Sequence, residues 1–126
     1  MSRALVAAAI LIVAVGLAHS WLGERYVIRR LLRRSDLPRL FGDDSFTRQT
    51  LRFAWHLTTL AWLGLAAVLL VLSGLWPSVR VGDGLILAIA ATFIGSALAA
   101  IVFTRARHVS WIVFALIAAL CLIALW

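Results

Sequence analysis

Three histidines and one glutamate are the residues of this chain best suited to chemistry inside an apolar fold. His19, His56 and His108 each lie beside the same end of a different apolar stretch, and Glu24 follows His19 by about one helical turn. At 1.5 Å of rise per residue, the depths of the three imidazoles agree to within about 10 Å. Ionisable residues in such segments usually face the interior of a bundle or water, so these four are candidates for function.

A cluster of this composition suits a divalent metal ion or a haem. Imidazole binds zinc, copper, iron and nickel, and a carboxylate adds compensating charge. A b-type haem needs only two axial histidines on facing helices, here His19 with His56 or His108. Propionates, or the headgroup of an anionic lipid, would be paired by the nearby arginines, which are Arg25, Arg29, Arg52 and Arg105. We therefore expect a metal or haem site at the cytoplasmic leaflet, with His19, Glu24, His56 and His108 as its ligands.

Two other interpretations of these residues stay open. Histidine, arginine and tryptophan also suit a lipid or quinone pocket in a non-enzymatic accessory or interaction protein. All three histidines can also be purely structural. Imidazole at a helix end, as at His56 and His108, often extends to the headgroups, and His19 can hydrogen-bond across to a threonine of another span, the candidates being Thr58, Thr59 and Thr104. Zinc-ligand motifs, GxSxG, Walker A and glycine-rich dinucleotide motifs are all absent, so the sequence identifies neither a reaction nor a particular cofactor.

The elements that must position these residues are transmembrane helices. Hydrophobic residues make up 64% of the 126 residues and charged residues 13%, against roughly 45–50% and 25% in soluble domains. Four apolar stretches have about the 20 residues needed to cross a hydrocarbon core of about 30 Å: 4–22, 53–73, 85–104 and 109–126. We predict an all-α integral membrane protein, residues 1–126 forming one domain of four transmembrane helices in an up-down bundle.

The arginines predict the orientation of this bundle. Ten of the twelve lie in the first and third connections, 23–52 and 105–108. Short cytoplasmic loops carry such an excess of positive residues. We therefore expect a protein of a bacterial-type inner (plasma) membrane with both termini on the non-cytoplasmic side. This topology also explains the net charge of +7, so no nucleic-acid partner is predicted.

The first two helices are predicted to continue beyond the membrane. Neither glycine nor proline interrupts Glu24 to Arg34, where arginines repeat every four residues beside apolar ones. Asp44 or Ser45 can cap the start of the second helix. Both helices should thus extend into the cytoplasm around the basic loop 23–52.

Small residues predict where the helices pack together. Ala91, Gly95 and Ala99 repeat every four residues in the third span, and Thr92, Ser96 and Ala100 form a second line beside them. Gly16 belongs to a similar line in the first span. Small side chains let helix backbones approach closely in lipid. Membrane lipids are the expected partners, and the small-residue lines leave open a homo-oligomer or a larger membrane complex.

Overall fold

The chain folds into helices alone. The computed structural model describes all 126 residues. The first helical stretch consists of α1 (Arg3–Leu22), the π-helical segment η1 (Gly23–Ile28) and the short α2 (Arg29–Leu31). It is followed by α3 (Ser45–Leu72), α4 (Val81–Thr104) and α5 (Ser110–Ile123), and no strand is present. The prediction of an all-α fold is confirmed.

Three of the helical stretches are long and apolar enough to cross a membrane. They are Arg3–Leu31, Ser45–Leu72 and Val81–Thr104. The first has 29 residues and is therefore roughly 44 Å long, which exceeds a hydrocarbon core of about 30 Å. Leucine, isoleucine and valine side chains are exposed on all the long helices, an arrangement suited to lipid. These features indicate a multi-pass membrane protein.

The fourth apolar stretch differs from the prediction. Of the expected span 109–126, only the 14 residues of α5 are helical, a length of roughly 21 Å. The chain winds into tighter turns after Ile123, where the amide of Leu125 donates to the carbonyl of Leu122. The molecule therefore has three full-length candidate spans and one short apolar helix rather than four equal spans.

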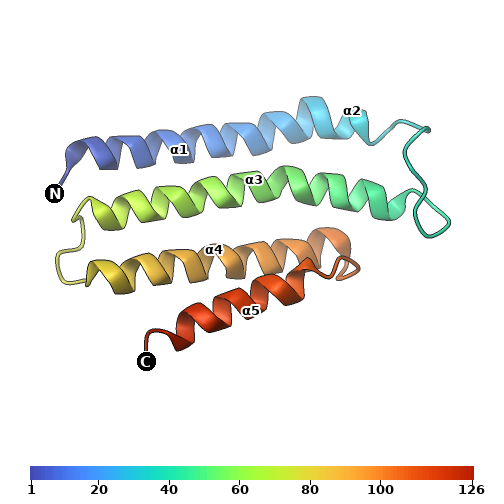
Figure 1. The fold of residues 1–126 in the computed structure, drawn as a ribbon. Coiled ribbons are helices and arrows are strands. Elements are labelled where there is room, and N and C mark those ends of the chain that lie inside the picture. Colours follow the sequence, from blue (N-terminus) through green and yellow to red (C-terminus); the bar gives the residue numbers. More distant parts are fainter.

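The helices lie side by side in an open row (Figure 1). They alternate in direction, and α1 packs against α3, α3 against α4, and α4 against α5. The backbones of α1 and α4 do not approach each other. The connections 32–44 and 105–109 share one end of the row, called the loop end below, and both termini lie at the other end. The row lacks the closed centre on which three helices of a compact bundle would converge.

Glycines let neighbouring helices in this row approach closely. A Cβ atom at Gly23 would lie 2.3 Å from the ring of Trp55, and one at Gly64 would lie 2.3 Å from the Thr92 hydroxyl. Gly16 is buried against α3, where the Thr59 hydroxyl lies 3.3 Å from its carbonyl oxygen. Close contact of α1 with α3 and of α3 with α4 thus depends on residues without side chains.

Of the two small-residue lines of α4, the one that contains Ser96 and Ala100 is the more buried in this row. Ala91 is exposed and Gly95 and Ala99 are half-buried, whereas Ser96 and Ala100, from the adjacent line, are buried. The physical reason lies in the hydroxyl groups of this helix. Thr92, Ser96 and Thr104 each donate to the carbonyl four residues earlier, at 2.5 to 2.8 Å. Their polar atoms are therefore satisfied within α4, and these residues can face neighbouring helices.

Candidate functional site

Glu24 and His56 are the two expected site residues that come together. The Nε2 atom of His56 on α3 lies 3.4 Å from Oε2 of Glu24 on η1. The imidazole stacks on Phe103 of α4, with ring centroids 5.1 Å apart. Arg52 and Arg29 hold the other carboxylate oxygen at 3.1 and 3.5 Å. The pair is thus fixed by side chains from three neighbouring helical segments at the loop end.

His19 lies on the same helix as Glu24 but faces another group of residues. Its ring stacks on Trp55 at a centroid distance of 4.4 Å and also contacts Trp62. Trp55 Nε1 donates to the His19 carbonyl oxygen at 3.2 Å, whereas Nε2 of the His19 ring is buried without a hydrogen-bond partner. His19 therefore packs as an aromatic ring between α1 and α3.

His108 is separated from both other histidines. It lies just before α5, where its Nδ1 atom is 2.8 Å from the Ser110 hydroxyl and its ring packs near Phe46 and Phe53. No group of three or more His, Cys, Asp or Glu side chains is placed to hold a metal ion. The three imidazoles face different neighbours because an open row cannot direct them to one centre.

Ser20 and Thr59 extend the Glu24–His56 pair and are not among the residues expected from the sequence. Ser20 Oγ lies 2.9 Å from His56 Nδ1 and 2.8 Å from Thr59 Oγ1. Four polar side chains from α1, η1 and α3 thus form one hydrogen-bonded chain. The signal in the sequence is a serine within an apolar stretch, one residue after His19 and four before Glu24.

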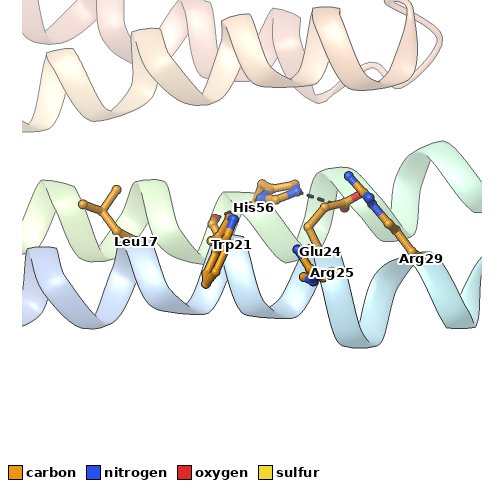
Figure 2. Close-up of a pocket in the computed structure, with 7 residues that line it drawn as sticks. Leu17, Trp21, Glu24, Arg25, Arg29 and His56 are labelled. Carbon is orange, nitrogen blue, oxygen red and sulfur yellow. Dashed lines mark hydrogen bonds and ion pairs between the residues drawn. The ribbon is translucent and has the colours of Figure 1, made fainter.

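Two cavities open beside this chain of polar groups. One of about 390 Å³, called the serine cavity, is shown in Figure 2 and is lined by Leu17, Ser20, Trp21, Glu24, Arg25, Arg29 and His56. The other, of about 500 Å³, is called the arginine cavity and is lined by Leu32, Arg48, Gln49, Arg52, Val102, Phe103 and Arg105. The four arginines singled out in the sequence are therefore divided two and two between the cavities.

The arginine cavity carries more positive charge than its neighbours neutralise. Arg48 pairs with Asp44, whose pKa is lowered by the hydrogen bond and charge of this guanidinium. Arg52 shares Glu24 with Arg29, and its Nε atom is buried without a partner. Arg105 forms no ion pair and takes a left-handed conformation, with φ of 52°, directly after α4. An anion entering this cavity would find donors that the protein itself leaves unused.

Gln49 is a third residue, after Ser20 and Thr59, that the sequence did not single out. It lines the arginine cavity one helical turn from Arg52, and its Oε1 atom is buried without a hydrogen-bond partner. A buried polar group without a partner in the protein usually has a water molecule or a ligand beside it. The side chain amide can thus complement a ligand that brings a hydroxyl group along with its negative charge.

No family model, curated protein or solved structure matches this chain.

Proposed function

We propose that this is a multi-pass protein of the cell inner membrane that binds the phosphate headgroup of an anionic lipid in its arginine cavity. The loop end faces the cytoplasm in this proposal, and both termini lie on the opposite side. The distribution of arginines supports that orientation, because the connections 23–52 and 105–108 hold ten of the twelve. The arginine cavity then lies at the cytoplasmic leaflet.

The unused donors of the arginine cavity are the observation that carries this proposal. Arg105 has no acidic partner, and the Nε atom of Arg52 is buried without an acceptor. Guanidinium groups bind phosphate oxygens through two parallel, charge-assisted hydrogen bonds. A phosphate group would accept from the free Nε–H of Arg52 and neutralise the charge of Arg105, which no carboxylate of the chain reaches.

The apolar wall of the arginine cavity favours a lipid over a free phosphate ion as its ligand. Leu32, Val102 and Phe103 line it beside the arginines, and Val102 is 72% exposed. An acyl chain lying along α4 from this wall would cover apolar surface while the headgroup stays among the arginines. The cavity therefore has the polar and apolar halves that an amphiphile requires.

The contacts of the histidines favour this proposal over a metal or haem site. His19 and His108 each have their own aromatic neighbours, and Glu24 accepts from arginines as well as facing His56. A bis-histidine haem would need two imidazoles on opposite sides of one cavity. Of the three histidines, His56 lines the serine cavity, and neither His19 nor His108 lines that cavity or the arginine cavity.

Lipid binding can be measured on the purified, delipidated protein by native mass spectrometry. We expect phosphatidylglycerol to bind in preference to phosphatidylcholine. The variant carrying both Arg52→Gln and Arg105→Gln should bind phosphatidylglycerol at least about tenfold more weakly, as expected for the loss of charge-assisted hydrogen bonds. Arg30→Gln is the matched control, because Arg30 is exposed at the same end and lines none of these cavities. Equal binding of the two lipids, or an equal loss in the control, would contradict the proposal.

A further inference from the structure

The serine cavity holds a second arrangement of polar side chains, beside the arginine cavity proposed to bind lipid. Figure 2 shows Glu24 lying between His56 on one side and Arg29 on the other, with Trp21 and Leu17 farther along the same helix. Ser20 lines the cavity too, next to His56. A hydroxyl, an imidazole and a carboxylate are thus connected in sequence at the edge of one cavity.

The distance between the Ser20 hydroxyl and His56 matches that between a nucleophile and its base, and Glu24 lies on the other side of the imidazole. Ser20 Oγ lies 2.9 Å from His56 Nδ1, and His56 Nε2 lies 3.4 Å from Glu24 Oε2. A nucleophile within hydrogen-bond reach of a base, with that base oriented by a third group, is the general pattern of nucleophilic catalysis. The pattern is recognised by geometry and roles rather than by position in the sequence.

The hydrogen-bond directions are consistent with this role. Ser20 lies 2.8 Å from Thr59, whereas Thr59 lies 3.3 Å from the Gly16 carbonyl oxygen. Thr59 has one hydroxyl hydrogen, so it can donate either to Gly16 or to Ser20. When it donates along the shorter contact to Ser20, the Ser20 hydroxyl is free to donate to Nδ1 of a neutral His56. The Nε2–H group of His56 then donates to the Glu24 carboxylate. Each polar hydrogen atom of these four side chains that lies between them then has an acceptor. The imidazole nitrogen facing Ser20 is able to receive a proton.

The supporting contacts keep these groups in place. His56 is stacked on Phe103 with an interplanar angle of 13°, which fixes the ring. Arg29 and Arg52 hold the Glu24 carboxylate from the side away from His56 Nε2, through its Oε1 atom. Arg25 lines the same cavity and forms no ion pair, so its guanidinium is available to a negative charge that develops there.

We propose that Ser20 is a nucleophile that cleaves carboxylic esters of amphiphiles, with His56 as its general base and Glu24 as the group that orients His56. Ser20 Oγ attacks the ester carbonyl carbon, and its proton moves to His56 Nδ1. The carbon–oxygen bond to the alcohol then breaks, and the alcohol leaves with that proton. A water molecule gives its proton to His56 and attacks the acyl-serine, which releases the carboxylic acid and restores Ser20.

The surroundings of Ser20 define the substrate class. The amide groups of α1 are used in helical hydrogen bonds, so an oxyanion must be stabilised by a side chain, and Arg25 is the unpaired cation at this cavity. Leu17 and Trp21 form the apolar wall of the cavity. An ester with an apolar acyl chain fits both features, since its chain lies on this wall and its carbonyl oxygen faces Arg25.

The chain contains its own control for this proposal. Ser110 Oγ lies 2.8 Å from His108 Nδ1, a contact as short as that between Ser20 and His56. His108 has no carboxylate partner, however, and its ring packs against Phe46 and Phe53. If proximity of serine to histidine were sufficient for reactivity, both serines would react equally.

The test is labelling of the full-length protein, purified in mild detergent, with an alkyl fluorophosphonate followed by peptide mass spectrometry. Serine attack on this probe expels fluoride and leaves a stable phosphonyl-serine. We expect an adduct on Ser20 and none on Ser110. His56→Gln should slow labelling of Ser20 by about 10²-fold or more, as expected for the loss of a general base, and Glu24→Gln and Arg25→Gln should slow it to a smaller extent. His108→Gln should have no effect.

Two readouts keep this test independent of folding and of lipid binding. Ser20→Ala should abolish both labelling and hydrolysis of a p-nitrophenyl acyl ester while phosphatidylglycerol still binds, because Ser20 does not line the arginine cavity. The thermal midpoint of each variant shows whether it is folded. Absence of the Ser20 adduct in the folded wild type, or labelling at an unchanged rate in folded His56→Gln, would overturn the proposal.

Discussion

At the scale of single residues, Gly23 determines how closely α1 and α3 pack. Its missing side chain makes room for the ring of Trp55, which in turn stacks on His19 and donates to the His19 carbonyl oxygen. Gly23 is also the first residue of the π-helical segment η1, and such segments are frequent at functional sites. One glycine thus sets the contact between the two helices that carry Ser20, Glu24 and His56.

Replacing Gly23 by alanine should destabilise the protein by about 1–3 kcal/mol, the usual cost of overpacking. The added methyl group would lie 2.3 Å from Trp55, whose ring has to move off His19. Gly82→Ala is the matched control, since a Cβ atom there meets nothing within 4 Å at the start of α4. Thermal unfolding in detergent measures both variants, and an equal effect in the two would show that Gly23 makes no special contact.

Replacement by phenylalanine should leave the thermal stability of the protein undiminished at His19 and lower it at His56. His19→Phe keeps an aromatic ring on Trp55 and removes a buried nitrogen that has no partner, so we expect an undiminished thermal midpoint. His56→Phe leaves Ser20 and Glu24 without their shared partner and should cost about 1–3 kcal/mol. Visible absorption spectra and metal analysis of the wild type and of His19→Phe test the cofactor hypothesis. A Soret band or a stoichiometric metal that His19→Phe removes would restore the cofactor hypothesis.

At the scale of elements, the turn between α4 and α5 positions Arg105 by means of a strained backbone. Arg105 and Ala106 both have positive φ values, 52° and 59°, a conformation that costs residues with a Cβ atom about 1–2 kcal/mol. Strain of this kind is often found at functional sites. Here it ends α4 abruptly and leaves the Arg105 side chain at the edge of the arginine cavity.

Ala106→Gly should therefore raise the stability of the protein by up to about 1 kcal/mol, because glycine adopts positive φ without a steric cost. Thermal unfolding measures the gain, and lipid binding should persist because Arg105 is unchanged. Ala124→Gly, at the end of α5 with a φ of −68°, should bring no gain. A loss of stability in Ala106→Gly would show that the turn is not strained.

The ion pair of Arg34 with Asp36 in the connection 32–44 should weaken in acid. The hydrogen bond from Arg34 lowers the pKa of Asp36 from 3.8 to about 2. Because this folded-state pKa lies below the unfolded value, the ion pair contributes stability above about pH 4 and loses it as the pH falls toward 2. Carboxyl NMR measures the titration. In Arg34→Gln the Asp36 pKa should return toward 3.8, and an unchanged value would contradict the role of Arg34.

At the scale of the whole molecule, the open row explains which features the sequence predicts and which it does not. Hydropathy indicates the helical stretches, and the uninterrupted segment after Glu24 indicates that the first continues to Leu31. The position of a residue along its helix follows from its number, so the sequence predicts a common depth for the three histidines. The neighbours that a side chain contacts depend on which helix packs against its own. In the open row, His19 contacts Trp55 and His56 contacts Glu24.

The residues missed by the sequence analysis are those whose role depends on a neighbouring helix. Ser20 and Thr59 are unremarkable in their own segments and gain significance only through the 2.8 Å contact between α1 and α3. Glu24 was expected beside all three histidines, and the structure brings it to His56 on the adjacent helix. Contacts within one helix can be derived from spacing, whereas contacts between helices require the packing itself.

The proposed topology predicts which end of the row a membrane-impermeant reagent reaches in intact cells. In a Cys121→Ala background, a cysteine at Ser35 in the loop end should react with an impermeant maleimide only after lysis. A cysteine at Ser78, in the connection between α3 and α4, should react in intact cells. Both positions are exposed, so access depends on the side of the membrane. The reverse pattern would contradict the proposed orientation and place the arginine cavity at the outer leaflet.

The most direct test of the central claim is to locate the lipid on the protein. A phosphatidylglycerol analogue with a photoreactive headgroup would be incorporated with the protein into nanodiscs, irradiated, and its crosslinks mapped by peptide mass spectrometry. We expect crosslinks to concentrate on residues that line the arginine cavity, among them Gln49 and Phe103, and to decrease in the variant with both Arg52→Gln and Arg105→Gln. Crosslinks spread evenly over both ends of the row, and unchanged in that variant, would show that the cavity does not bind the headgroup.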